Sequence, residues 1–433
     1  MDLIEINANS GKVRVVYTDE SDTNIEYKTQ LYFAEKENIA FVTSEKTGWN
    51  QLYKVDWKTG KTSQFHPGEY VVLEIKAVDE LNKEIYFTAS AVENGINPYY
   101  QFLYKTDFNG KKLVKLTAEP VDHQVFVSKD FKYFIDNRST PNQPTISTLR
   151  STKDGKIISE IGRSDFSELT KKGWKTPEII STTARDGKTE IFAAIWKPTH
   201  FDSSKKYPVI DYTYTGPHTQ VVPFNFSKVI WTYAYNDIQA LAELGFIVVQ
   251  IDGLGSAGRS KIFRDWSYGK LGDNLKDHEL MIKYIGEKYS WADTERVGIF
   301  GHSAGGYDAA HALLTLNETY KVGVSMAADH DWRMEKAWWP EMYAGWPVGD
   351  YYDEQSNVTL APNLKGNLLL MHGGIDENVN PSATFKLSEA LIKAGKYFDM
   401  LIIPSARHGI PKEYEIYVSR KKWDYFLKHL KVE

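Results

Sequence analysis

The chain has 433 residues, of which 42% are hydrophobic and 25% charged, and its formal net charge is −5. This length and apolar content suffice for two or three domains with buried cores. There is no long basic run, which argues against nucleic acid as a partner, and the absence of cysteine excludes disulfides and thiol catalysis. No apolar stretch reaches the roughly 18 residues of a membrane span, and the N-terminus lacks the pattern of a signal peptide.

Residues 1–176 predict a domain built of short β-strands. Alternating runs such as 39–43 and 84–88 lie between polar turns, with the spacing typical of sandwiches, barrels and propellers. A repeat is also visible, because a strand, an Asp and a Gly-bearing turn occur at both 52–60 and 103–110. A repeat of roughly 40–50 residues indicates propeller blades, and a β-sandwich with two similar hairpins is the alternative.

At this spacing, residues 1–176 hold about three to four blades. A closed propeller usually needs at least four blades. We therefore expect an incomplete, propeller-like domain, in a chain that begins inside a longer propeller.

From residue 177 the pattern changes to apolar runs that alternate with helical segments. The runs that predict buried strands are 208–212, 246–250, 297–300, 322–324, 368–371 and 400–403. The helices predicted among them are 277–284, 306–314, 383–394 and 414–430. This alternation predicts a mostly parallel, doubly wound sheet covered on both faces, so residues 177–433 are assigned to one α/β domain.

The sharpest motif is Gly301-His302-Ser303-Ala304-Gly305, which lies between a predicted strand and a predicted helix. This is the G-x-S-x-G nucleophile elbow in the strand–turn–helix context that it requires. The turn is tight, so a Cβ on either glycine would clash with its neighbours. The helix N-terminus below the serine favours the negative charge that forms on attack. The motif predicts an α/β-hydrolase domain with Ser303 as its nucleophile.

Two residues that follow strands complete a catalytic triad. Asp376 follows the run 368–371, and His408 follows the run 400–403. Catalytic groups of open α/β sheets lie at the carboxyl ends of strands, and Ser, Asp, His is the chain order of α/β hydrolases. We expect His408 to take the proton of Ser303 and Asp376 to orient the imidazole. If they are not catalytic, Asp376 is an ordinary surface residue of a turn and His408 an ordinary loop residue.

These residues resemble the prolyl oligopeptidase family of serine peptidases, in its dipeptidyl peptidase IV branch. In the second half of the chain the resemblance rests on residues 212–217, 252–256, 303–307, 376–379 and 408–410. In the first half it rests on residues 48–53, 86–90 and 97–100, which look like the last propeller blades of that family. The resemblance implies a serine exopeptidase that releases N-terminal dipeptides from short peptides, after proline or alanine, through an acyl-enzyme.

The resemblance also implies an oxyanion hole and a substrate pocket. The oxyanion donors would be the backbone N–H of Ala304 and the hydroxyl of Tyr214. The substrate-binding residues would be Asn378, Val379, Trp332, Trp339 and Tyr307. Aromatic walls suit a proline ring. Without the resemblance, Tyr214 is a partly buried strand residue and the tryptophans are ordinary packing under a lid.

The chain departs from the family pattern at three places. Ala304 stands where dipeptidyl peptidase IV has a tyrosine that helps to close the proline pocket, and Glu335 stands where a second pocket tyrosine is expected. In the family, a pair of propeller glutamates holds the free amino terminus of the substrate, and a basic residue also helps to hold the substrate. We expect the segment that carries them to lie outside this chain. The preference for proline is therefore left open.

Neither of two acid–histidine clusters predicts a metal site. Residues 329–331 and 277–279 lack the two-histidine spacing of metalloproteases. We expect the first to form a polar wall near the pocket and the second to lie on a solvated helix face. No metal and no organic cofactor are implied.

Two other functions remain open from the sequence. One is an acylaminoacyl peptidase or esterase on the same fold, and the other is an inactive hydrolase-like binding protein. The expected partner is a peptide substrate. By analogy with the family, a homodimer and export to the periplasm in a longer precursor are implied as well.

Overall fold

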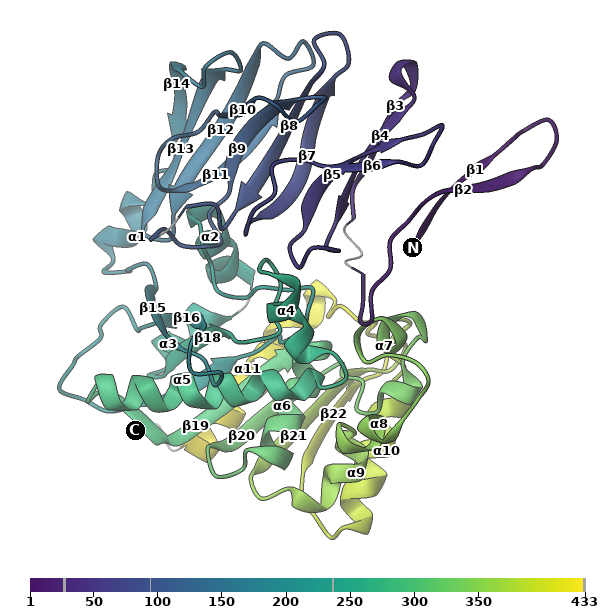
Figure 1. Cartoon of the computed structure of the whole chain (residues 1–433). Coiled ribbons are helices and arrows are strands. Elements are labelled where there is room, and N and C mark those ends of the chain that lie inside the picture. Colours follow the sequence, from purple (N-terminus) through teal and green to yellow (C-terminus); the bar gives the residue numbers. More distant parts are fainter. Residues whose placement is uncertain (26–28, 94, 236, 431–433) are drawn as a thin grey trace. The chain divides into compact units, whose positions relative to one another are not determined.

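The computed structural model describes residues 1–25, 29–93, 95–235 and 237–430 (Figure 1). The chain divides into two compact units. Unit 1 comprises Met1–Asp165, Phe224–Ser227 and Gly258–Phe263, and unit 2 comprises Phe166–Pro223, Lys228–Ala257 and Arg264–Glu433. The domain boundary at 176/177 stays a prediction, and the two units are treated separately below.

In its described residues, unit 1 is built from an antiparallel hairpin, β1 and β2, and three antiparallel four-stranded sheets, β3–β6, β7–β10 and β11–β14 (Figure 1). The strands are β1 (Asp2–Ile6), β2 (Val13–Thr18), β3 (Leu31–Ala34), β4 (Ile39–Ser44), β5 (Gln51–Asp56), β6 (Thr62–Gln64), β7 (Val71–Asp79), β8 (Glu84–Ser90), β9 (Phe102–Asp107), β10 (Leu113–Lys115), β11 (Asp122–Val127), β12 (Tyr133–Thr140), β13 (Gln143–Ser151) and β14 (Ile157–Arg163). Strands that follow one another in the chain are neighbours in each sheet, as in a propeller blade.

Successive sheets share buried apolar cores. The first and second sheets share a cluster that includes Phe41 and Phe87. The second and third share another cluster that includes Leu103 and Phe134. Three sheets packed in series differ from the two layers of a β-sandwich, the alternative considered above. Unit 1 is therefore a propeller-like domain.

The sequence repeat corresponds to one hairpin in two successive sheets, β5–β6 and β9–β10. Asp56 and Asp107 end the first strand of each hairpin, and each carboxylate accepts the backbone N–H two residues on, at 3.1 and 2.7 Å. Gly60 and Gly110 follow with φ of 72° and 64°. A left-handed residue is accessible to glycine at little cost, which explains why both turns carry one.

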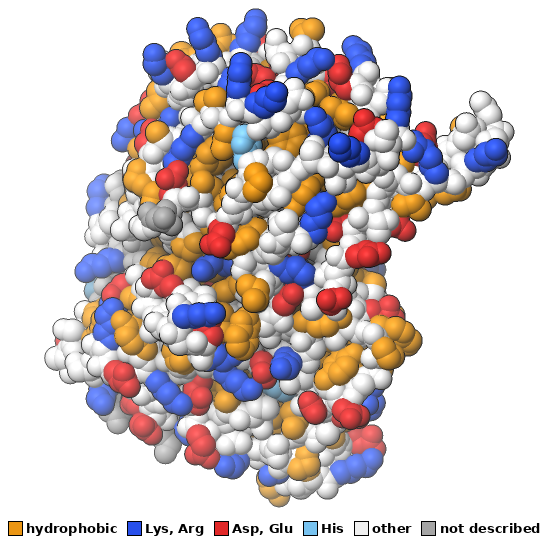
Figure 2. Space-filling view, in the orientation of Figure 1, with side chains coloured by type: hydrophobic (Ala, Val, Ile, Leu, Met, Phe, Trp, Pro, Cys, Tyr) orange, Lys and Arg blue, Asp and Glu red, His pale blue; other side chains and the backbone are white. Residues whose placement is uncertain are grey.

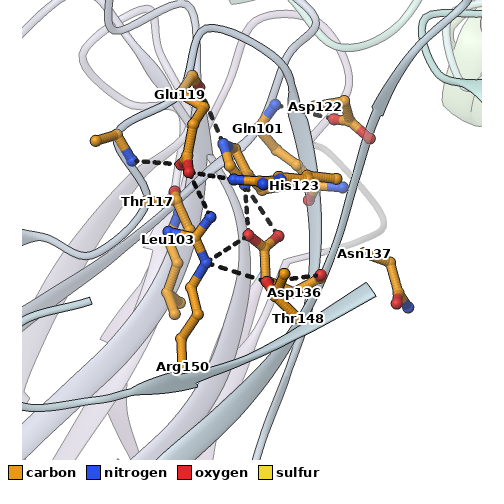
Figure 3. A network of polar contacts seen from close by, with 12 residues as sticks. Gln101, Leu103, Thr117, Glu119, Asp122, His123, Asp136, Asn137, Thr148 and Arg150 are labelled. Carbon is orange, nitrogen blue, oxygen red and sulfur yellow. Dashed lines mark hydrogen bonds and ion pairs between the residues drawn. The ribbon is translucent and has the colours of Figure 1, made fainter. Parts of the chain in front are cut away.

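A buried polar network joins the strands of the third sheet (Figure 3). Asp136 on β12 accepts a hydrogen bond from Nδ1 of His123 on β11 at 2.9 Å, and it lies 2.9 Å from Nε of Arg150 on β13. A second guanidinium nitrogen of Arg150 lies 2.7 Å from the carboxylate of Glu119. The His123 and Asp136 side chains are fully buried and that of Arg150 is 4% exposed. Buried charges persist only when they are paired, so these contacts fix the three strands to one another.

Two short segments from the second half of the chain belong to unit 1. Asn225 donates its side-chain amide to the carboxylate of Asp122 at 2.9 Å, and burial raises the pKa of this carboxyl to about 6. The backbone N–H of Lys261 donates to the carbonyl of Gly48 at 2.8 Å. Nothing in the local sequence of these segments predicts such contacts.

The described part of unit 2 contains an eight-stranded sheet in the order β15-β16-β18-β17-β19-β20-β21-β22. The strands are β15 (Glu178–Thr183), β16 (Glu190–Trp196), β17 (Tyr207–Tyr212), β18 (Ile247–Asp252), β19 (Ala292–His302), β20 (Tyr320–Met326), β21 (Asn367–Gly373) and β22 (Asp399–Ile403). β16 pairs antiparallel with β15 and with β18, and the other pairs are parallel. All six predicted runs are strands, whereas β15 and β16 were not predicted.

The described helices of the chain are α1 (Ser167–Lys171), α2 (Phe226–Tyr235), α3 (Ile238–Glu243), α4 (Lys261–Arg264), α5 (Leu275–Lys288), α6 (Ala304–Thr315), α7 (Trp338–Tyr343), α8 (Asp350–Glu354), α9 (Asn357–Leu360), α10 (Ser382–Lys393) and α11 (Lys412–Leu430). In Figure 1, α5 and α6 lie in front of the sheet of unit 2, and α11 lies behind it. The sheet is thus covered on both faces, which explains why its central strands are mostly apolar.

The expectation that residues 277–279 lie on a solvated helix face is wrong. Asp277 and His278 are both buried on α5. Asp277 pairs with Arg185 at 2.7 Å, and Nδ1 of His278 bonds to the carboxylate of Asp211 at 2.8 Å. These partners are distant in sequence, so the helical pattern alone could not reveal that two polar residues face the sheet.

The surface carries charges of both signs. In Figure 2, Lys and Arg side chains are interspersed with Asp and Glu side chains over the visible face, in agreement with the small net charge of −5. Over the described ranges, no helix combines the length and hydropathy that crossing a membrane requires.

Candidate active site

Ser303 lies at a strained turn between β19 and α6. It has φ 61° and ψ −121°, a conformation that a residue with a side chain rarely adopts. A Cβ on Gly305 would lie 2.2 Å from the carbonyl oxygen of Thr213, and one on Gly301 would lie 2.5 Å from the same atom. Both contacts are too short for any residue except glycine, so the two glycines allow the chain to make this turn.

Asp376 and His408 are joined by a hydrogen bond. Nδ1 of His408 lies 2.8 Å from Oδ2 of Asp376, and an ionised carboxylate only accepts, so Nδ1 carries the proton. The other oxygen of Asp376 accepts the backbone N–H groups of Asn378 and Val379 at 2.8 and 2.9 Å. Burial raises the pKa of Asp376, but the bond to His408 and the two backbone bonds outweigh it, so the pKa lies below its usual value.

His302, which precedes the nucleophile, holds the loop of His408 beside the elbow. Nε2 of His302 donates to the backbone carbonyl of His408 at 2.8 Å, and the two ring centroids are 4.7 Å apart. Burial lowers the pKa of His302 to about 4, so the ring is neutral at pH 7. The sequence analysis did not identify this contact, although its motif contained His302.

The bond from His302 places the loop of His408 beside the elbow that carries Ser303. No bond within 3.5 Å joins the Ser303 hydroxyl to the His408 ring in the described residues. In proteins without substrate, catalytic hydrogen bonds are often long and tighten only in the complex. The missing bond therefore does not exclude His408 from the candidate triad.

Tyr214 and Ala304 line the same pocket as Ser303. Ala304 is the first residue of α6, where the backbone N–H groups have no acceptor inside the helix. Tyr214 lies in the loop after β17. These are the positions from which a backbone N–H and a hydroxyl can both reach an oxygen that develops negative charge near Ser303.

Asp308 fixes the loop that carries Tyr214. The carboxylate of Asp308 accepts both the backbone N–H and the hydroxyl of Thr215, each at 2.7 Å. Burial raises the pKa of Asp308 to about 7. The sequence analysis missed this residue, although an acid inside the otherwise apolar helix after the nucleophile is a signal that could have identified it.

A pocket of about 240 Å³ opens beside Ser303. All five residues expected to bind substrate line it, namely Asn378, Val379, Trp332, Trp339 and Tyr307. The rings of Trp332 and Tyr307 are 5.5 Å apart, and the side chain of Trp332 is buried. Asp329 and Glu335 line the pocket as well, together with Lys336 and Trp338, which the sequence analysis did not single out.

Lys336 contacts the loop that follows Asp376. Its ammonium donates to the side-chain oxygen of Asn378 at 2.9 Å and also to the backbone carbonyl of that residue. It lies 3.3 Å from the carboxylate of Glu335. Lys336 therefore occupies hydrogen-bonding groups of Asn378 at the edge of the pocket.

Comparisons with known proteins agree on one family. Residues 231–433 match the model of the prolyl oligopeptidase family, and residues 1–145 match that of the dipeptidyl peptidase IV N-terminal region. Dipeptidyl peptidase 8 of Mus musculus is 28% identical over 94% of this chain and 50% of its own length. Dipeptidyl peptidase 4 of Trichophyton equinum is 29% identical over 85% of this chain and 48% of its own length.

Solved structures show the same likeness. Dipeptidyl peptidase 4 of Porphyromonas gingivalis superposes with a TM-score of 0.86 at 25% identity, over 99% of this chain and 60% of that chain. A candidate dipeptidyl aminopeptidase IV from Bacteroides ovatus gives 0.87 at 26% identity, over 99% and 62%. These matches relate residues 231–433 to the prolyl oligopeptidase family and residues 1–145 to the dipeptidyl peptidase IV N-terminal region, and they support a propeller-like domain combined with a peptidase domain. The chain spans about half the length of the curated relatives that it matches.

Proposed function

We propose that the protein is a serine exopeptidase that releases N-terminal dipeptides from short peptides through an acyl-enzyme. The observation that carries this proposal is the site in unit 2, where Ser303 on its strained elbow shares a pocket with Tyr214 and Ala304. The hydrogen bond between Asp376 and His408 supports the same conclusion. The relatives named above are dipeptidyl peptidases, which favours this activity over other hydrolyses.

We further infer that unit 2 has the α/β-hydrolase fold. Its support is the strand order, in which β16 is antiparallel to its neighbours and β17 and β18 exchange places in an otherwise sequential sheet. The elbow follows β19, and the loops after β21 and β22 carry Asp376 and His408. Ligands of open α/β sheets bind at these carboxyl ends.

In the proposed reaction, the Ser303 hydroxyl attacks the carbonyl carbon after the second residue of the peptide. Nε2 of His408 accepts the hydroxyl proton, and Asp376 stabilises the imidazolium that forms. The Ala304 N–H and the Tyr214 hydroxyl donate to the oxyanion. His408 then gives its proton to the departing amine, and a water molecule attacks the acyl-enzyme to release the dipeptide.

The first test combines covalent labelling with a substrate comparison. A fluorophosphonate probe is expected to label the protein at Ser303, and Ser303→Ala is expected to remove the label, as read by mass spectrometry of the digested protein. Dipeptide p-nitroanilides with a free amino terminus should turn over faster than the same substrates with an acetylated amino terminus. Turnover of acetylated substrates alone would indicate an acylaminoacyl peptidase, and an unlabelled folded protein would indicate a binding protein.

The second prediction concerns Tyr214. Tyr214→Phe is expected to lower kcat roughly 10²- to 10³-fold with little change in KM, because its hydroxyl contacts the oxyanion and not the bound substrate. Steady-state kinetics on a dipeptide p-nitroanilide measure both constants. Tyr212→Phe is the matched control, since Tyr212 is the last residue of β17, two residues before Tyr214, and does not line the pocket. Equal effects of the two substitutions would argue against an oxyanion role.

A further inference from the structure

The pocket beside Ser303 is lined by more acidic than basic side chains. Its charged lining residues are the two acids Asp329 and Glu335 and the single base Lys336. Glu335 and Lys336 lie 3.3 Å apart and compensate each other. Asp329 is thus the acid of the pocket that has no basic partner among the described residues.

Asp329 is buried, with 9% of its surface exposed. One carboxylate oxygen accepts the backbone N–H of Asp331 at 3.3 Å, and the other has no hydrogen-bond partner among the described residues. Nor does any described basic side chain place a nitrogen within 4.0 Å of this carboxylate. The neighbouring Asp331 differs, because Arg333 pairs with it at 2.7 Å. A buried carboxyl with a vacant acceptor is costly, and a ligand that donates to it would recover that cost.

The raised pKa of Asp329 also favours a cationic ligand in the pocket. Burial raises the pKa of Asp329 well above its usual value, and the charge of Glu335 raises it further. A cation placed in the pocket would lower this pKa again, because it would stabilise the ionised form. The carboxyl therefore interacts more favourably with a positively charged side chain than with a neutral one.

The other walls of the pocket fit an aliphatic stem. Trp332, Trp339 and Tyr307 supply flat apolar surfaces, against which the methylene groups of a long side chain pack. Aromatic faces also attract the cation at its end. Ala304 contributes only a methyl group beside the nucleophile, so space for such a side chain remains. A proline ring would make these apolar contacts and leave Asp329 without a donor.

We propose that this pocket selects a cationic side chain, such as that of lysine, ornithine or arginine, in the residue before the scissile bond. The Asp329 carboxylate would pair with this cation. The inference rests on the proposed function, because it assigns the specificity of that same site. Glu335 is expected to share the cation, since it lines the pocket with only 11% of its side chain exposed.

The test compares p-nitroanilides of Ala-Lys, Ala-norleucine, Ala-Gln and Ala-Pro on the unaltered protein. Lysine and norleucine have similar stems, so the ratio of their kcat/KM values isolates the terminal charge. We expect lysine to exceed norleucine roughly 10- to 100-fold, the effect of hydrogen bonds to a charged group, and to exceed proline as well. Glutamine distinguishes a requirement for charge from a requirement for any donor.

Substitutions then locate the effect. Asp329→Asn is expected to bring the ratio of lysine to norleucine close to one, and Glu335→Gln to lower it partly. Glu341→Gln is the matched control, because Glu341 is an exposed acid on the nearby helix α7 that does not line the pocket. It should leave the ratio unchanged.

A norleucine or proline substrate that equals or exceeds the lysine substrate would overturn the inference while leaving the dipeptidyl peptidase intact. Equal turnover of glutamine and lysine would do the same. An unchanged ratio of lysine to norleucine in folded Asp329→Asn would show that Asp329 does not bind the cation. If that variant does not fold, the four substrates on the unaltered protein still test whether the pocket prefers a cationic side chain. Absence of turnover for all four substrates would instead contradict the proposed function itself.

Discussion

Asp376→Asn is expected to lower kcat about 10⁴-fold and to leave the fold intact. The asparagine oxygen can still accept the backbone N–H groups that now bond to Asp376, so its NH₂ group would face His408. An NH₂ group in that place forces Nδ1 of His408 to accept, which puts the ring proton on Nε2. That tautomer cannot take the proton of Ser303, and the carboxylate that would stabilise the imidazolium is absent.

Steady-state kinetics on a dipeptide p-nitroanilide, with circular dichroism to monitor folding, measure this effect. Glu377→Gln is the matched control, because Glu377 is the next acid in the chain and its exposed side chain pairs with Arg407 at the surface. We expect this control to retain kcat within about twofold, as surface ion pairs contribute little. A kcat of Asp376→Asn within tenfold of the unaltered protein would exclude Asp376 from the triad.

The residues of the candidate triad could be predicted because their signals are local. Ser303 lies in a five-residue motif whose glycines are required by backbone contacts of 2.2 and 2.5 Å. Asp376 and His408 follow apolar runs that are unambiguous as buried strands. The substrate pocket could not be predicted from local signals. Trp332 and Trp339 were assigned through the family resemblance, because no spacing in the sequence indicated them.

Two strands of unit 2 were missed although a local signal exists. β15 and β16 flank a turn in which Asp186 accepts two backbone N–H groups and Gly187 has φ 74°. An Asp-Gly pair between two alternating runs is a hairpin signal. A pattern of parallel strands joined by helices does not indicate this antiparallel hairpin at the edge of the sheet.

Other features could not be read from local sequence. Asp277 is buried because Arg185, 92 residues away, pairs with it. Asn225 belongs to unit 1 because of its bond to Asp122, 103 residues away. Hydrophobic periodicity places apolar residues, whereas the burial of a polar residue depends on a partner that only the folded chain supplies.

Arg150→Met is expected to destabilise the third sheet of unit 1 by about 3–5 kcal/mol. Methionine preserves most of the side-chain volume but removes the positive charge that pairs with Asp136 and Glu119 (Figure 3). Asp136 would then be a fully buried carboxylate that keeps, among the described residues, the hydrogen bond from the His123 ring. Breaking a buried pair by removing one member leaves an uncompensated charge, which is more costly than never having buried it.

Native-state hydrogen exchange of the β11–β14 amides measures this loss in the whole chain, without requiring both units to unfold together. Arg163→Met is the matched control in the same sheet, because Arg163 pairs with Glu160 at the surface and is 62% exposed. Protection should fall strongly in the first variant and stay unchanged in the second. Equal protection in both would mean that the buried network does not stabilise the sheet.

The pH dependence of the same amides gives an independent test. Burial raises the pKa of Glu119, but the bond from Arg150 and the charges of Arg150 and Arg138 outweigh it and lower the pKa from 4.5 to about 2. A carboxyl with a lowered pKa in the folded state stabilises above its unfolded value and loses that contribution as the pH falls. The third sheet should therefore lose stability between about pH 4.5 and 2, and Arg150→Met should reduce this loss because Glu119 would titrate closer to its usual value. An unchanged acid dependence in Arg150→Met would show that Arg150 does not hold Glu119 ionised, and any contribution of Arg150 to the sheet would then come from its pairing with Asp136.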